Sequence, residues 1–149
     1  MPTRYHLAQF NVATMRFPLD HPEMREFAAQ IDSINRLADE SPGFVWRLQD
    51  TSGNSTAMRP MGEHVLLNMS VWESIDALHA YTYRSEHRKL FAARKTWFEP
   101  SGQRDLVLWW TPAGEIPSVE EAQTRLEQIR LFGPCQGAFD FKHRVPPPA

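Results

Sequence analysis

Histidine, tyrosine and arginine side chains in the middle of the chain have the chemistry of a functional site. His79, Tyr83 and His87 are spaced by four residues, and a four-residue step places side chains on one stripe of a helix. An imidazole can move a proton near neutral pH, a phenol can donate a hydrogen bond to a substrate oxygen, and Arg84 or Arg94 can hold a carboxylate. We predict His87 and Tyr83 as catalytic residues and the two arginines as substrate-binding residues. The alternative is that the stripe is a polar, solvent-exposed helix face.

The histidine spacing argues against a mononuclear metal site. His79 and His87 are eight residues apart, which is about 12 Å along a helix at about 1.5 Å per residue, and no third ligand is evident. Haem needs only one axial ligand, so a haem protein with His87 as that ligand is an alternative. Cys135 is the only cysteine, which excludes a disulfide within the chain and a cysteine zinc site.

Two asparagines lie in segments that are otherwise suited to strands. Asn11 shares one face of the first predicted strand with Gln9, and Asn68 is a polar member of an apolar third strand. A buried polar side chain requires a partner. We predict Asn11 as a catalytic residue that orients a ligand or activates oxygen without a cofactor, and Asn68 as a substrate-binding residue. The alternative is that both bond to neighbouring loops.

Aromatic side chains form a third group of candidates. The chain has five tryptophans, of which Trp97 and Trp109 are predicted to bind a flat apolar or aromatic substrate. Adjacent Trp109 and Trp110 point to opposite faces of a strand. The alternative is that these residues belong to the core or to an interface.

The elements that must position these residues alternate along the chain. Strands are predicted at 5–14, 44–48, 65–72 and 106–110, where apolar and β-favouring residues are bounded by turn signals. Asp20 is predicted to cap a first helix, Ser74 a second that runs to about Trp97, and Ser118 a third that keeps Phe132 on its apolar face. The order β-α-β-β-α-β, with an extra C-terminal helix and tail, predicts an α+β fold of the ferredoxin-like kind. We expect an antiparallel sheet with both long helices on one face.

The other face of this sheet also needs a cover. One parity of the third strand carries Val65, Leu67, Met69 and Val71. A second subunit is the economical cover, which predicts a homodimer in the form of a dimeric α/β-barrel. The alternative is that the third helix and tail cover part of this face within one chain.

Size and charge limit the class of protein. The 149 residues fit a single domain, predicted over 1–149, and the formal net charge of −2 gives no general attraction to nucleic acid or to an anionic membrane. The first residues carry no apolar signal-peptide core, and no apolar run reaches the length of a bilayer span. We therefore expect a cytoplasmic protein.

Several sequence blocks, spread over nearly the whole chain, carry a resemblance to a known family. They are Tyr5-His6-Leu7-Ala8-Gln9-Phe10-Asn11, Ser41-Pro42-Gly43-Phe44, Val71-Trp72-Glu73-Ser74, Ser85-Glu86-His87-Arg88, Trp97-Phe98, Leu108-Trp109-Trp110, and Gly133-Pro134 followed by Ala138-Phe139. Together they resemble the bacterial "domain of unknown function 3291" family, which in turn is similar to the dimeric α/β-barrel superfamily. That superfamily includes cofactor-free monooxygenases, haem enzymes, isomerising enzymes and plain ligand binders, so the resemblance implies a fold more than a function. Three functions follow as expectations: an oxygenase-like enzyme for a flat substrate held between sheet and helices, a haem protein, or a non-catalytic dimeric binding module.

Overall fold

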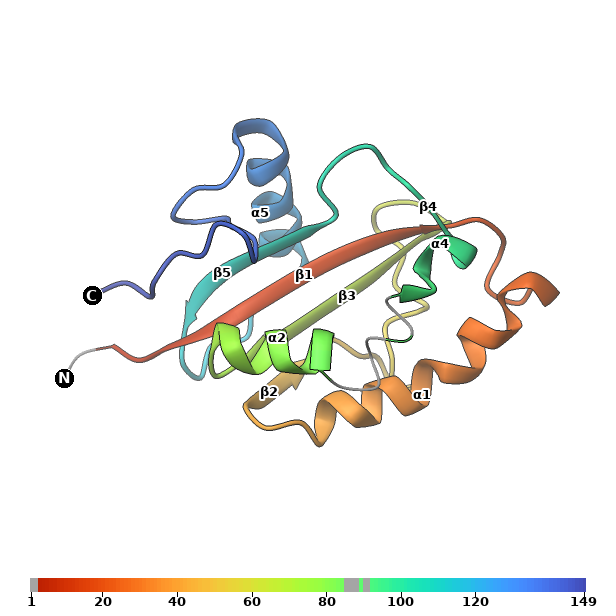
Figure 1. The fold of residues 1–149 in the computed structure, drawn as a ribbon, viewed down its shortest axis with the longest axis horizontal. Coiled ribbons are helices and arrows are strands. Elements are labelled where there is room, and N and C mark those ends of the chain that lie inside the picture. The colour runs from red at the N-terminus through yellow and green to blue at the C-terminus, as the bar shows by residue number, and fades with distance from the viewer. Residues whose placement is uncertain (1–2, 85–88, 90–91) are drawn as a thin grey trace.

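The computed structural model describes residues 3–84, 89 and 92–149 and shows a mixed α+β fold. His87 lies outside the described residues. The strands are β1 (Tyr5–Met15), β2 (Phe44–Arg47), β3 (Val65–Trp72), β4 (Phe98–Glu99) and β5 (Leu106–Pro112). They form one open antiparallel sheet in which β3 separates β2 from β1. The other edge of β1 pairs with β5 along Tyr5–Asn11 and with β4 at Thr14 and Met15 (Figure 1).

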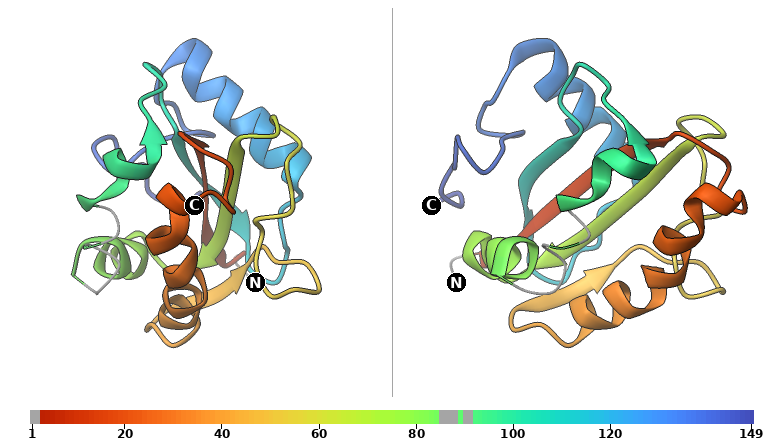
Figure 2. Two further views of the ribbon diagram at one scale, coloured as in Figure 1. Left: turned by 90° about the vertical axis from the view of Figure 1, so that its right-hand side faces the viewer. Right: turned by 45° about the vertical axis from the view of Figure 1, so that its right-hand side comes forward.

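Helices lie on both faces of the sheet (Figure 2). One face carries the 3₁₀-helix η1 (Pro22–Met24), α1 (Arg25–Asp39), α2 (Ile75–Arg84) and the single turn α4 (Arg94–Trp97). The opposite face carries α5 (Val119–Phe132). In the described parts of the chain, no helix combines the length and the apolar character that crossing a bilayer requires.

The α5 face of the sheet contains the largest cluster of buried apolar residues. Leu67, Met69 and Val71 pack there with the α5 side chains, and each is at most 3% exposed. The sheet face that was predicted to be covered by a second subunit is therefore covered by α5 of the same chain. This is the alternative given by the sequence, in which the third helix covers part of this face. The homodimer itself stays a prediction.

Both ends of α5 agree with the prediction, since Ser118 caps its start and Gly133 follows its last residue, but one predicted face residue differs. Ser118 Oγ accepts a hydrogen bond from the Glu121 backbone N–H at 3.1 Å. The apolar residues Ala122, Leu126 and Ile129 are buried as predicted. Phe132 was predicted on the same face, and this was wrong, because its side chain is 79% exposed. By the last turn the helix has rotated Phe132 away from the sheet.

The predicted long helix between Ser74 and Trp97 is not continuous. Ser74 Oγ accepts from the Ala77 backbone N–H at 3.1 Å, as predicted, but Ala93 is a turn residue that separates α4 from the helical residue before it. The turn places Trp97, 4% exposed, in a cluster with Met15 and Met24. The chain then becomes extended and forms β4, a strand that the sequence did not predict.

The first helix also begins differently from the prediction. Asp20 is exposed, and His21 takes the capping role, since its Nδ1 accepts from the Glu23 backbone N–H at 3.0 Å. The His21 ring stacks on Phe17, with 4.6 Å between ring centroids. The predicted stop at Ser41 is confirmed, because α1 ends at Asp39 and Ser41 Oγ donates to the carbonyl of Leu37.

Candidate functional site

Four polar side chains lie together on the central strands, and we call them the amide network: Gln9, Asn11, Asn68 and Ser70. The β1–β3 register pairs Asn11 with Asn68 and Gln9 with Ser70, so all four project from the face that carries α1 and α2. Their two-residue spacing on both strands is what brings them to one face.

Hydrogen bonds join the network into one unit. Gln9 Nε2 donates to Asn68 Oδ1 at 2.5 Å and to Ser70 Oγ at 2.8 Å. Asn11 Nδ2 donates to Gln9 Oε1 at 2.8 Å and to Asn68 Oδ1 at 3.3 Å. The indole N–H of Trp72 donates to Ser70 Oγ at 2.8 Å, which ties the network to a fully buried ring. Bonds of this kind orient the amides before any ligand arrives.

The network leads from the buried interior to the surface. Gln9 is 3% and Ser70 6% exposed, whereas Asn11 is half-buried and Asn68 is exposed. The last residue pair between β2 and β3 is Arg47 with Ser70. Asn68 of β3 therefore lies beyond the part of β3 that pairs with β2. Among the residues that the structure describes, Asn68 Nδ2 and Asn11 Oδ1 have no hydrogen-bond partner. An unused donor and an unused acceptor are therefore presented on the open part of the sheet.

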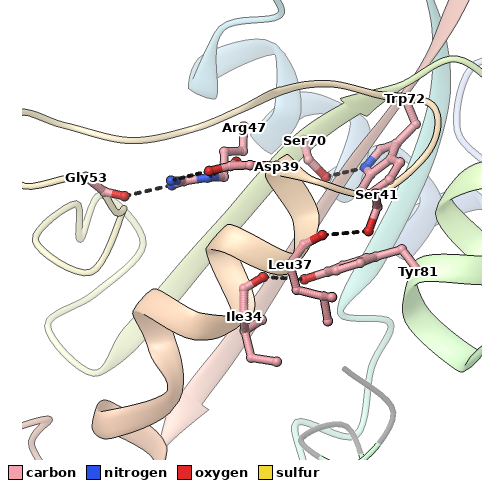
Figure 3. Close-up of polar contacts among 9 residues, drawn as sticks. All are labelled: Ile34, Leu37, Asp39, Ser41, Arg47, Gly53, Ser70, Trp72 and Tyr81. Carbon is pink, nitrogen blue, oxygen red and sulfur yellow. Dashed lines mark hydrogen bonds and ion pairs between the residues drawn. The ribbon is translucent and has the colours of Figure 1, made fainter. Parts of the chain in front are cut away.

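Aromatic packing holds the buried end of the network in place. The Trp72 ring stacks on Tyr81 of α2, with 5.1 Å between centroids, and meets Phe44 edge-on at 5.5 Å. The Tyr81 hydroxyl donates to the carbonyl of Ile34 in α1 at 3.2 Å (Figure 3). Burial raises the pKa of the Tyr81 phenol, so this group is neutral near neutral pH. These contacts fasten both helices to the sheet beside the network.

An ion pair lies at the β2 edge of the same face. Arg47 pairs with Ser70 across the strands and bonds Asp39 of α1 through its Nε at 2.7 Å. Its Nη1 also donates to the carbonyl of Gly53 at 2.7 Å (Figure 3). The Arg47 side chain is 13% exposed, so its charge is matched at Asp39 and not directed to solvent.

The predicted helical stripe contacts the C-terminal segment. Tyr83 is 39% exposed, and its ring lies 4.6 Å from that of His79 and 5.8 Å from that of Phe141, centroid to centroid. His79 also meets Phe141 edge-on at 5.6 Å. His87, the third member of the stripe, is outside the described residues, so its position relative to the amide network stays a prediction.

Ion pairs and hydrogen bonds attach this C-terminal segment to the rest of the chain. Arg144 pairs with Asp76 of α2 at 3.0 Å, and Trp110 Nε1 donates to the carbonyl of Val145 at 2.7 Å. Asp140 contacts His143, with 2.9 Å between Oδ1 and Nδ1. Burial alone raises the pKa of Asp140, but the hydrogen bonds from His143 and the neighbouring positive charges outweigh it, so the pKa is lowered overall.

The structure separates the remaining predicted site residues. Trp109 pairs with Ala8 and lies fully buried on the α5 face, 5.9 Å from the Arg125 guanidinium, so the sheet stands between it and the asparagines. Trp97, the last residue of α4, is buried in the core, and its ring lies 5.6 Å from that of Phe27. Arg84 and Arg94 are both exposed, at the end of α2 and the start of α4.

Of the predicted residues, the structure therefore joins Asn11 to Asn68 and brings neither tryptophan to them. Gln9 and Ser70 were not predicted as site residues. The signal for them was present, since each lies two residues from a predicted asparagine on the same strand. Among the described residues, no three His, Cys, Asp or Glu side chains are grouped so as to hold a metal ion.

Comparisons with known proteins identify a family but no activity. A family model described as "Domain of unknown function (DUF3291)" matches residues 6–149. No curated protein matches the chain. A solved protein of unknown function from Nitrosomonas europaea is similar at 14% identity and a TM-score of 0.47, over 78% of this chain and 99% of its own. A solved protein from Pseudomonas aeruginosa is similar at 10% identity and a TM-score of 0.49, over 77% of this chain and 100% of its own.

Proposed function

We propose, for a chain that belongs to the DUF3291 family, that the amide network is the floor of a binding site for a flat, largely apolar small molecule. Asn11 and Asn68 hold the polar edge of that molecule, and the chain acts on it as an oxygenase-like enzyme. His87 and Tyr83 remain the proposed catalytic side chains.

One observation carries the proposal. The hydrogen-bonded network ends on an unused N–H of Asn68 and an unused oxygen of Asn11, at an open place on the two central strands. Polar side chains stabilise a folded sheet less than apolar ones unless all their hydrogen bonds are made. Both groups reach solvent, and a ligand that completes these bonds would give the exposed end of the network a function.

The oxygenase-like reaction needs no external reductant. A phenol and one dioxygen molecule give a quinone and one water, with the substrate supplying all the electrons. The chain's part is to orient the phenol and to move its proton, for which the proposed groups are the Asn11 carboxamide and the His87 imidazole.

The finer description of the fold belongs to the same proposal. The chain order of strands and helices, and the placement of β3 between β2 and β1, support a ferredoxin-like sheet. We propose that two copies associate as a homodimer, in which α5 of each chain occupies the sheet face where a dimeric α/β-barrel would place the partner sheet. Analytical ultracentrifugation tests this, since a monomer at all concentrations contradicts it.

The haem alternative depends on His87 alone. His79, the histidine of α2, contacts the rings of Tyr83 and Phe141 and, within the described part of the chain, forms no hydrogen bond with the amide network. Reconstitution with haem tests this alternative, because a Soret band that His87→Ala abolishes would establish it and displace the oxygenase-like reaction.

Ligand binding and turnover test the main proposal together. Native mass spectrometry of the purified protein looks for a retained small molecule, and an oxygen electrode follows consumption with phenols and quinols. Asn68→Leu is expected to abolish both signals, whereas Gln103→Leu, an exposed side chain away from the network, leaves them unchanged. A protein that binds no small molecule, and in which His87→Ala changes only stability, is the non-catalytic module instead.

A further inference from the structure

We infer that the ligand of the amide network is neutral and carries a hydrogen-bond acceptor beside a donor, as in a carboxamide, a lactam or an enolised hydroxy-ketone. This inference rests on the proposed function and narrows it to a chemical class. It follows from the hydrogen-bonding groups that the network leaves unused, from the charges around the network and from the apolar residues beside it.

The unused donors and acceptors of the network determine which hydrogen bonds a ligand must make. Both N–H groups of Asn11 Nδ2 are used, by Gln9 Oε1 and Asn68 Oδ1, and both N–H groups of Gln9 Nε2 are used as well. At the exposed end of the network, what is left is the Asn68 amide N–H group as a donor and Asn11 Oδ1 as an acceptor. The two side chains bond each other across paired positions, so the unused donor and the unused acceptor come from neighbouring strands on one face. A ligand that satisfies both presents an acceptor to Asn68 and a donor to Asn11.

The charges around the network favour a neutral ligand. Arg47 is the one titratable side chain that pairs with a network residue among the described strands, and Asp39 neutralises it at 2.7 Å. The phenol of Tyr81 is neutral and bonded to Ile34. A carboxylate placed on Asn68 would gain no opposite charge from this floor in exchange for the water it displaces.

The residues beside the asparagines are apolar. Asn11 pairs with Leu106 on one side, and the next paired residues on the same face towards β4 are Ala13 and Leu66. Leu106 and Ala13 are half-buried, so part of their surface is available to a ligand. A flat hydrocarbon body fits over these residues while its polar edge lies on the asparagines.

Three probes of matched shape test the class. Naphthamide offers acceptor and donor, methyl naphthoate offers an acceptor only, and naphthoate carries a charge. Binding is measured by calorimetry and by the side-chain amide signals of Asn11 and Asn68 in ¹H–¹⁵N spectra. We expect naphthamide to bind about tenfold tighter than the ester, the value of one hydrogen bond, and tighter than the carboxylate.

Variants test whether the preference for naphthamide arises at the amide network. They also separate the proposed site from the inferred ligand class. Asn68→Leu is expected to remove the preference for naphthamide, while Gln103→Leu retains it. If naphthoate binds best and Arg84→Ala or Arg94→Ala weakens it, the proposed site stands and the inferred class is wrong. If none of the probes shifts the two asparagine signals, the inferred class and the proposed site both fall.

Discussion

The bond between Trp72 and Ser70 allows a quantitative test of the amide network. In Ser70→Ala, the indole N–H of Trp72 loses its acceptor at a position with no solvent exposure. A buried donor without a partner costs about 1–3 kcal/mol. Gln9 Nε2, in a side chain that is 3% exposed, also loses one acceptor and keeps the one at Asn68, which adds to this cost. We expect a loss of about 2 kcal/mol in the free energy of unfolding, or about 4–8 °C in Tm for a chain of this size.

Chemical denaturation with a double-mutant cycle is the assay. Trp72→Phe removes the donor, so Ser70→Ala should destabilise the Trp72→Phe protein much less than the wild type, with a coupling of about 1 kcal/mol or more. Ser33→Ala, at an exposed serine of α1, is the matched control and should change stability by less than about 0.5 kcal/mol. If Ser70→Ala behaves like this control, or if the two substitutions are additive, the bond does not stabilise the network as argued.

Three further changes have expected outcomes. Ser118→Ala should lower the free energy of unfolding by about 1 kcal/mol through loss of the α5 cap, whereas Ser118→Asp should retain most of it in denaturant titration. Gly43→Ala should cost about 2 kcal/mol or more, because φ is +82° and the new Cβ would lie 2.6 Å from Ala77 Cβ; a Tm equal to the wild type contradicts this. The folded pKa of Asp140 lies below its unfolded value, so its stabilising effect is present above the unfolded pKa of about 4 and is lost as pH falls through the folded one. Asp140→Asn should flatten the acid limb of a plot of Tm against pH, and His143→Ala should flatten it in part; parallel curves contradict the assignment.

Local sequence signals predicted most elements because their causes are local. The third strand was predicted at 65–72 and β3 spans Val65–Trp72, since apolar residues and flanking turns define it without help from the rest of the fold. The cap at Ser118 is equally local. The turn at Ala93 has no such signal, because neither glycine nor proline marks it and its cause is the packing of Trp97 into a distant cluster.

The candidate site was predicted only in part, because strand register is not a local property. Alternation showed that Trp109 and Trp110 point to opposite faces, but not which of them shares a face with Asn11. The pairing of Ala8 with Trp109 settles this and assigns Trp109 to the α5 side. The exposure of Phe132 has a similar origin, since each three-residue step on a helix falls about 60° short of a full turn and the drift accumulates.

The central place of β1 affects how the chain is made. β1 comes before every strand that pairs with it, and both of its edges are filled by segments that follow much later, β3 on one side and β5 on the other. During translation, one edge stays unpaired until β3 has left the ribosome, and the second until Leu106–Pro112 has done so. A nascent chain of this protein therefore exposes an apolar strand with free backbone groups for most of its synthesis, and this is the interval in which a chaperone would be needed.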